Sequence, residues 1–371
     1  NYTTHQATEG LGPIASTGAD STLGLEVHSL LVANLAGTPL GLLDVQSWAR
    51  DPSTYGQSKD RSDLPTNAKE SQKWLNGYAA ANAAAKRLAN TQVVVVGDRE
   101  ADVFDLFQMA TAGRAQLLVR ATQPRRILAP DGKVEGHLWD CVRQEAVAGQ
   151  MEVHVPRRGT RQARVAQVEL RYREVEICQP KKRGGKRRSV RVFAVAATET
   201  SATAKAGEAE PIEWLLLTTL PVTTIEQAEE KVRWYALRWL IEVFHRTLKS
   251  GCGVENRQAK RKESLEAALA VDVVVAWRIM WLTKLGRETP DAPCSIFFEE
   301  EEWQALHCFA NRTKTPPAEP PCLRDAVRMV ATLGGFLGRK SDREPGTETI
   351  WRGLERLMDF TIAFRMFFSS A

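Results

Sequence analysis

Apolar and polar residues between Thr223 and Gly251 follow the period of a helix and divide it into two faces. Thr224 with Gln227 three positions later is typical of a capping box, and Gly251 suits a helix end. One face is apolar and consists of Leu237, Leu240, Ile241, Phe244 and Leu248. The other face is polar and consists of Tyr235, Arg238, Glu242, His245, Arg246 and Lys249. The pattern predicts one long helix with a side for the core and a side with candidate chemistry.

The first 126 residues alternate between strand and helix patterns. Two apolar runs flank a short turn at residues 36–38 and predict a hairpin. Four consecutive valines before Gly97 predict a strand that is buried on both faces, as in parallel sheets. The expected elements are strands over 23–35, 39–49, 92–97 and 115–126 and helices over 67–88 and 101–112. This order predicts an α/β fold.

Residues 127–212 have a different character. Segments with alternating or β-branched residues are separated by basic turns, and they predict a β-rich insertion. Six lysines and arginines lie within residues 181–188. Such a cluster indicates contact with phosphate, and the alternative is a solvated strand edge. After a strand over 213–219 and the long helix, the residues beyond 255 are expected to be helical.

Composition narrows the class of protein only a little. The net charge of +5 over 371 residues does not by itself indicate a nucleic-acid partner. The six cysteines form no CxxC pair, which favours a reducing compartment and argues against structural zinc. No apolar run approaches 18 residues, so we expect a soluble cytoplasmic protein without membrane contact. The first residue is Asn, which suggests a fragment of a longer protein.

Asp98 directly follows the valine strand and precedes a predicted helix. Functional groups of open α/β sheets collect at the carboxyl ends of strands, and Glu100 and Asp102 add negative charge there. The alternative is a carboxylate that only caps the next helix. In the same way, the (i, i+4) pairs of Glu242 with Arg238 and Arg246 also suit an ordinary solvated helix.

The spacing Tyr235-x2-Arg238-x3-Glu242-x6-Lys249 resembles the signature of bacterial cut-and-paste DDE transposases of the insertion-sequence class, relatives of the transposon-five transposase. The string from Asp98 to Asp102 is similar to the segment of the second catalytic carboxylate in that family. The resemblance implies an RNase H-like core over 1–126 and 213–255, interrupted by the insertion over 127–212. It also implies a helical C-terminal region over 256–371 that pairs two subunits.

The resemblance implies a metal-dependent enzyme that cleaves transposon ends and transfers them to target DNA. Asp98 and Glu242 would be catalytic carboxylates that bind two Mg²⁺ ions, with Mn²⁺ as an alternative. The partners would be double-stranded DNA and a second copy of the chain, at the bacterial nucleoid. The residues that match DNA contacts of the family are Arg120, Pro124, Arg125, Trp214, Tyr235, Arg238, Trp239 and Lys249. For the two tryptophans the alternative is a place in the core, and for the arginines it is a solvated strand end.

One part of the family pattern is missing. The first catalytic carboxylate should precede the hairpin in a strand of its own, and the chain starts in a segment that resembles the one just after it. We therefore expect residues 1–371 not to cleave DNA efficiently. Two other functions stay open. One is a truncated, non-catalytic inhibitor that binds DNA and forms mixed dimers, and the other is a stand-alone RNase H-like nuclease.

Overall fold

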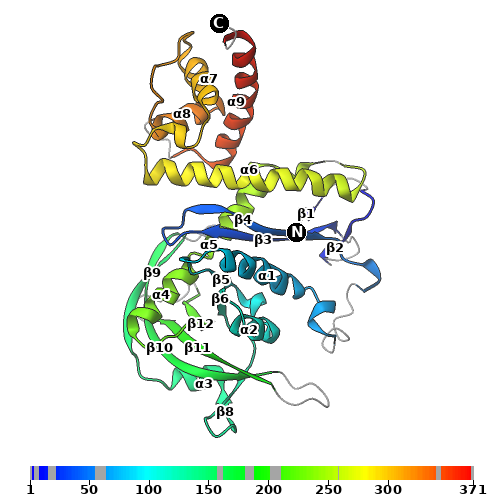
Figure 1. The fold of residues 1–371 in the computed structure, drawn as a ribbon, viewed down its shortest axis with the longest axis vertical. Coiled ribbons are helices and arrows are strands. Elements are labelled where there is room, and N and C mark those ends of the chain that lie inside the picture. The colour runs from blue at the N-terminus through cyan, green and yellow to red at the C-terminus, as the bar shows by residue number, and fades with distance from the viewer. Residues whose placement is uncertain are drawn as a thin grey trace. The chain divides into compact units, whose positions relative to one another are not determined.

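The structure is a computed structural model that describes residues 2–3, 8–15, 22–54, 64–156, 162–179, 188–200, 210–257, 259–339 and 344–368. The chain divides into two compact units, residues 56–239 and residues 1–55 with 240–371 (Figure 1). Within the described ranges, no helix is long and apolar enough to cross a membrane.

The described strands of unit 56–239 form one sheet of eight. β5 (Val94–Gly97) is parallel to β6 (Gln116–Arg120), and β6 is antiparallel to β12 (Glu213–Thr218). The sheet continues through β11 (Ser189–Glu199), β10 (Arg164–Cys178), β7 (Arg126–Leu128) and β8 (Val134–His137), and β9 (Gly149–Val155) pairs with β10. The β-rich region expected over 127–212 therefore extends the same sheet as the strand before Asp98.

Helices pack on this sheet and complete the core of the unit. They are α1 (Gln72–Arg87), α2 (Phe104–Thr111), α3 (Leu138–Arg143) and α4 (Ile225–Ala236), with 3-10 turns η2 (Thr66–Ala68) and η3 (Arg99–Ala101). Val232 and Tyr235 of α4 are buried against strand residues such as Val168 and Leu216. The carboxyl end of β5 thus belongs to a sheet that is supported by a closely packed core.

The second unit combines a small sheet with helices. Its strands are β1 (Tyr2–Thr3), β2 (Gly12–Ala15), β3 (Thr22–Ala33) and β4 (Pro39–Trp48), and β3 and β4 form the expected hairpin. Its short turns are η1 (Pro52–Thr54), the π-turn η4 (Thr247–Gly251), η5 (Val254–Asn256) and η6 (Cys294–Ile296). Its helices are α6 (Lys262–Glu288), α7 (Glu300–Asn311), α8 (Leu323–Leu333) and α9 (Thr347–Phe368).

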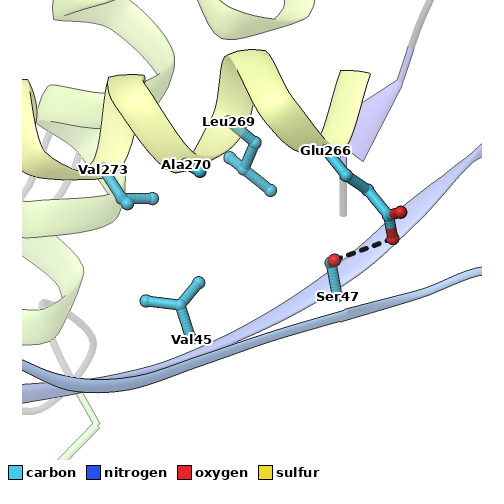
Figure 2. Close-up of a pocket in the computed structure, with 6 residues that line it drawn as sticks. All are labelled: Val45, Ser47, Glu266, Leu269, Ala270 and Val273. Atoms are coloured by element: carbon cyan, nitrogen blue, oxygen red, sulfur yellow. Dashed lines mark hydrogen bonds between the residues drawn. The ribbon is translucent and has the colours of Figure 1, made fainter. Parts of the chain in front are cut away.

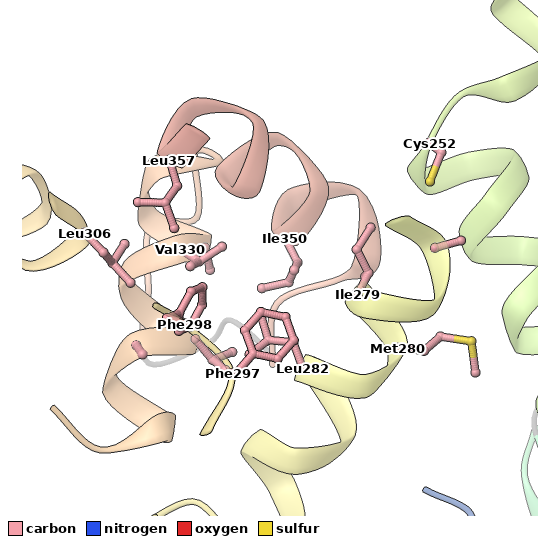
Figure 3. Packing of buried hydrophobic residues seen from close by; sticks show 14 of the residues in the cluster. Cys252, Ile279, Met280, Leu282, Phe297, Phe298, Leu306, Val330, Ile350 and Leu357 are labelled. Atoms are coloured by element: carbon pink, nitrogen blue, oxygen red, sulfur yellow. The ribbon is translucent and has the colours of Figure 1, made fainter. Parts of the chain in front are cut away.

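The C-terminal helices share one apolar core. Figure 3 shows side chains of α6, α8 and α9 that converge, among them Ile279, Val330 and Ile350. Gly353 lets α9 approach α8 closely, because a Cβ at this position would lie 2.0 Å from the carbonyl oxygen of Val330. The prediction of a helical region beyond residue 255 agrees with this arrangement.

A small cavity lies between β4 and α6 (Figure 2). Its volume is about 280 Å³, and it is lined by Val45, Ser47, Glu266, Leu269, Ala270 and Val273. Ser47 Oγ donates to Glu266 Oε1 at 2.9 Å, so the polar groups of this cavity satisfy each other. Its walls are otherwise apolar, and it carries no candidate chemistry.

The helix expected over 223–251 is interrupted. Thr224 caps it as predicted, with Gln227 N donating to Thr224 Oγ1, but α4 ends at Ala236 and α5 (Trp239–Arg246) starts anew. At the break, Leu237 N donates to Trp234 O and Arg238 N donates to Tyr235 O, both i to i−3 bonds. These bonds form a tighter turn than an α-helix, which a 3.6-residue period does not reveal.

All six cysteines are free thiols. Cys141, Cys178, Cys252, Cys294 and Cys308 are buried, and Cys322 is half-buried at the start of α8. Burial raises the pKa of Cys252 to about 12 and that of Cys294 to about 11.

Candidate functional site

Asp98 lies at the carboxyl end of β5, as predicted, and opens the 3-10 turn η3. Its Oδ1 accepts a hydrogen bond from Glu100 N at 2.9 Å, so it does cap the following turn. The turn lies close to the strand, because a Cβ at Gly97 would lie 2.4 Å from Ala101 Cβ. Capping uses one lone pair of the carboxylate, and the remaining ones are compatible with a hard metal ion.

Tyr235 is the centre of a cluster in the same unit. Its ring centroid lies 4.9 Å from that of Trp214 and 5.9 Å from Cζ of Arg238. Burial raises the pKa of Tyr235, and the nearby cations Arg238 and Arg120 oppose this rise. Arg120 also hydrogen-bonds to the tyrosine side chain, and Asp98 is close enough to act on it electrostatically. The structure thus brings together five residues that the sequence singled out from four separate segments.

The two arginines of the cluster have different anchors. Arg120 Nη2 donates to the backbone oxygen of Glu213 at 3.0 Å, which fixes the guanidinium at the border of β6 and β12. Arg238 lies in the turn between α4 and α5 and approaches the face of the Tyr235 ring. Both are partly exposed, so this corner of the unit offers two cations to a negatively charged ligand, next to the buried Tyr235.

The surroundings of Arg125 differ from those expected of a residue that contacts DNA. It is buried, with 5% of its surface exposed, and its guanidinium binds Asp102. Nε and Nη2 are paired internally, and Nη1 is buried without a hydrogen-bond partner among the described residues, so the guanidinium is not presented to a phosphate in this structure. Pro124 next to it is exposed on the loop that follows β6. Sequence reasoning missed Asp102 as the partner, because the two residues are far apart in the chain and share no local pattern.

Glu242, Lys249 and His245 belong to the other unit. Glu242 lies in the first turn of α5 and Lys249 in η4, where its Nζ is 3.1 Å from Glu255 Oε1. Burial lowers the pKa of His245 to about 4, Lys249 adds to this effect, and Glu242 opposes it. His245 Nε2 is buried and has no hydrogen-bond partner within the described residues. His245 is therefore a neutral imidazole next to Glu242 and Lys249 at neutral pH.

Trp239 starts α5 and is half-buried. It directly follows Arg238, so the sequence signature places a cation and an indole side by side at the turn between α4 and α5. Among the described side chains, no group of three His, Cys, Asp or Glu forms a metal site within reach of one ion. The carboxylates of Asp98 and Glu242, one in each unit, have hard oxygen atoms, which is the donor type that Mg²⁺ and Mn²⁺ prefer.

The described arginines of the insertion are paired with carboxylates. Arg164 binds Glu199, Arg173 binds Glu135 and Glu145, and Arg191 lies 3.5 Å from Glu174. Arg188 donates to Gln108 at 2.7 Å and lies 3.5 Å from Asp105. These side chains are neutralised locally, so the expected phosphate-binding surface would rest on other residues. Lys181 to Arg187 and Arg157, Arg158 and Arg161 lie outside the described residues.

Comparison with known protein families gives two matches. Residues 62–275 match the model of the transposase DDE domain. Residues 274–370 match the model of the transposase Tn5 dimerisation domain. The first match covers more than half of the chain and contains both Asp98 and Glu242. The second covers most of α6 and all of α7, α8 and α9.

Proposed function

The chain belongs to the family of DDE transposases related to Tn5, and from this premise we propose that it cleaves the ends of a transposon and joins them to target DNA. The observation that carries the proposal is the cluster around Tyr235. Asp98, Arg120, Trp214 and Arg238 approach one buried phenol from four segments. A carboxylate beside cations and an indole suits a phosphodiester with an adjoining base. We place this activity at DNA in the bacterial cytoplasm.

In this proposal each residue has one task. Asp98 and Glu242 hold divalent metal ions, which supply an activated water and stabilise the leaving oxygen when they are bound. Tyr235, Arg120 and Arg238 hold the phosphates on either side of the scissile bond by hydrogen bonds and charge. Lys249 adds a further cation, and its ion pair with Glu255 is replaced by an ion pair with a phosphate when DNA binds. Trp214 and Trp239 stack on an unpaired base at the transposon end, and Pro124 lines the path of the strand.

A third carboxylate completes the metal site in this proposal. β5 pairs with β6 only, so its other edge has no partner strand within the described part of the chain. We propose that a strand on this edge carries the third carboxylate beside Asp98, because neighbouring strand ends meet at one edge of a sheet. A non-catalytic DNA-binding dimer that inhibits transposition is the second candidate function, because no group of three His, Cys, Asp or Glu among the described side chains could hold one metal ion.

The dimer is proposed to form through α9. Four apolar side chains of this helix are exposed at spacings of four, four and one: Met358, Ile362, Met366 and Phe367. Met366 and Phe367 are 69% and 77% exposed, which is unusual for residues of this kind on a helix that also supports a core. The same helix lies within the match to the dimerisation domain. A second copy of the chain is the partner that would cover this face.

The experiment measures binding and cleavage with one set of DNA duplexes. The purified chain is mixed with duplexes that carry transposon ends or scrambled ends, with Mg²⁺, Mn²⁺ or Ca²⁺. We expect tighter binding of the transposon ends than of the scrambled ends. Where cleavage occurs, Glu242→Gln should abolish it while binding persists. Tight end-specific binding without cleavage would favour the non-catalytic function. Cleavage of both duplexes at the same rate would instead identify a nuclease without end specificity.

A further inference from the structure

A buried ion pair lies behind the turn that starts at Asp98. Arg125 Nε donates to Asp102 Oδ1 at 2.8 Å, and Arg125 Nη2 donates to the backbone oxygen of Asp102 at 2.9 Å. Nη2 also contacts Oδ1. The side chains of Arg125 and Asp102 are 3% and 0% exposed. Two guanidinium nitrogens thus share one carboxylate oxygen, and one of them also binds the backbone. Because this ion pair is shielded from water, it forms a fixed joint, unlike a solvated pair at the surface.

The second oxygen of Asp102 binds the loop that follows β6. Thr122 N and Gln123 N donate to Asp102 Oδ2 at 2.7 Å and 2.8 Å. One carboxylate therefore satisfies two backbone amides and one guanidinium. It connects the segments that follow the carboxyl ends of β5 and β6, which are neighbouring parallel strands. The guanidinium of Arg125 is held from another side by Phe107, with Cζ 5.5 Å from the ring centroid.

Asp102 is also the last residue of the turn that Asp98 begins. Asp102 N donates to Arg99 O at 3.3 Å, and Asp98 accepts from Glu100 N at the start of the same turn. The turn is thus fixed at its first residue by a cap and at its last residue by the ion pair. Arg120 and Pro124 lie on the other side of the joint, at the exit of β6.

We propose that Asp102 and Arg125 are positioning residues that hold the Asp98 turn and the 120–124 loop at a fixed separation. Their task is to set the direction of the Asp98 carboxylate toward metal and of Arg120 toward phosphate. This gives Arg125 an internal role in place of a direct contact with DNA. The proposal rests on the proposed function, since Asp98 acts there as a metal ligand and Arg120 as a DNA contact.

The two roles of Arg125, contact with DNA and positioning of Asp98, predict opposite effects when a charge of the pair is removed. If Arg125 contacted a phosphate, Arg125→Gln would lower the salt slope of DNA binding by about one, and Arg125→Lys would keep it. Asp102→Asn would then leave binding unchanged or strengthen it, because it removes a negative charge. If the pair positions Asp98, Arg125→Lys and Asp102→Asn both weaken Mn²⁺ binding, by roughly 10- to 100-fold.

The experiment uses the full chain with transposon-end DNA, and titrates Mn²⁺ by calorimetry. Hydrogen exchange of the 116–126 segment reports on the amides of Thr122 and Gln123. Arg191→Gln is the matched control, since it breaks the exposed ion pair with Glu174 on the same sheet. We expect Asp102→Asn and Arg125→Lys to lose amide protection and Mn²⁺ affinity, and the control to behave as wild type.

A further variant separates positioning from folding. The double variant Asp102→Leu with Arg125→Met removes both charges, a change that buried pairs often tolerate without unfolding. We expect it to fold by circular dichroism and still to bind Mn²⁺ weakly. Wild-type Mn²⁺ affinity in any folded variant of the pair would overturn the proposal. If the wild-type chain binds neither Mn²⁺ nor end DNA, the proposed function fails, and the amide protection in Asp102→Asn still decides whether the joint exists.

Discussion

The edge of the Trp214 ring meets the ring of Tyr235, with their planes inclined at 71° and their centroids 4.9 Å apart. Trp214 comes from β12 and Tyr235 from α4, so this contact joins the sheet to the helix at the candidate site. Edge-to-face pairs of this kind contribute about 0.5–1.5 kcal/mol beyond the area they bury. Trp214 therefore helps to set the position of the tyrosine hydroxyl, in addition to any contact it makes with a base.

Replacement of Trp214 separates these two effects. We expect Trp214→Ala to weaken binding of transposon-end DNA by about 1–3 kcal/mol, because a stacking surface and the support of Tyr235 are both lost. Trp214→Phe keeps the contact with Tyr235 and should lose less. Fluorescence anisotropy with labelled end DNA measures both. Trp351→Ala is the control, since Trp351 is a half-buried tryptophan of α9 in the other unit. Equal losses for Trp214→Ala and Trp351→Ala would contradict this role.

The buried imidazole of His245 makes stability depend on pH. Its pKa is about 4 in the folded chain, against an ordinary value near 6.5. Between these values the unfolded chain binds a proton that the folded chain does not bind. The stability contribution is therefore complete above pH 6.5 and falls as the pH decreases toward 4, by on the order of 3 kcal/mol.

Urea unfolding at several pH values measures this loss. His245→Gln should show a smaller decrease in the free energy of unfolding between pH 7 and pH 4.5 than the wild-type chain. The comparison removes the contributions of the carboxylates, since both chains share them. If the two chains lose stability in parallel over this range, His245 is not the group responsible.

Gly353 is expected to be required for the packing of α8 on α9. In Gly353→Ala the new Cβ would lie 2.0 Å from Val330 O, so the two helices must separate. We expect a loss of about 1–3 kcal/mol in the free energy of unfolding, although alanine favours helices. Gly346→Ala is the matched control, because a Cβ at Gly346 meets no atom within 4 Å. A wild-type unfolding curve for Gly353→Ala would show that the close approach is not needed.

Gly97 controls the turn that carries Asp98. A Cβ at this position would lie 2.4 Å from Ala101 Cβ, so Gly97→Ala should displace η3 from the strand end. We expect weaker Mn²⁺ binding and slower cleavage, with binding of end DNA in Ca²⁺ largely preserved. The double variant Gly97→Ala with Ala101→Gly returns the space and should restore Mn²⁺ affinity. Failure of this rescue would mean that the effect arises elsewhere.

The sequence predicted the parts of the site that local pattern can reveal. A valine run followed by glycine placed Asp98 at a strand end, and helical spacing grouped Tyr235 with Arg238. The α/β class, the hairpin and the helical C-terminal region followed from the same periodicities. The identity of the DDE transposase family came from a motif whose spacing spans two helices and a turn between them.

Tertiary contacts determine what the sequence did not reveal. The sequence predicts an exposed strand end at Arg125. Only the folded chain shows Asp102 as its buried partner, 23 residues away. The break after Ala236 depends on i to i−3 bonds that leave the hydrophobic period intact. The extension of the core sheet by β10 and β11 depends on which strands pair. A run of β-branched residues does not specify its neighbour.

The burial of five of the six thiols makes this protein a convenient object for chemical labelling. Among the six cysteines, a maleimide reagent would react with Cys322 alone, because only this thiol lies outside the core, at the start of α8. A single fluorophore could thus be attached to residues 1–371 without prior removal of cysteines. Energy transfer between two such fluorophores would then report when two copies come together on DNA.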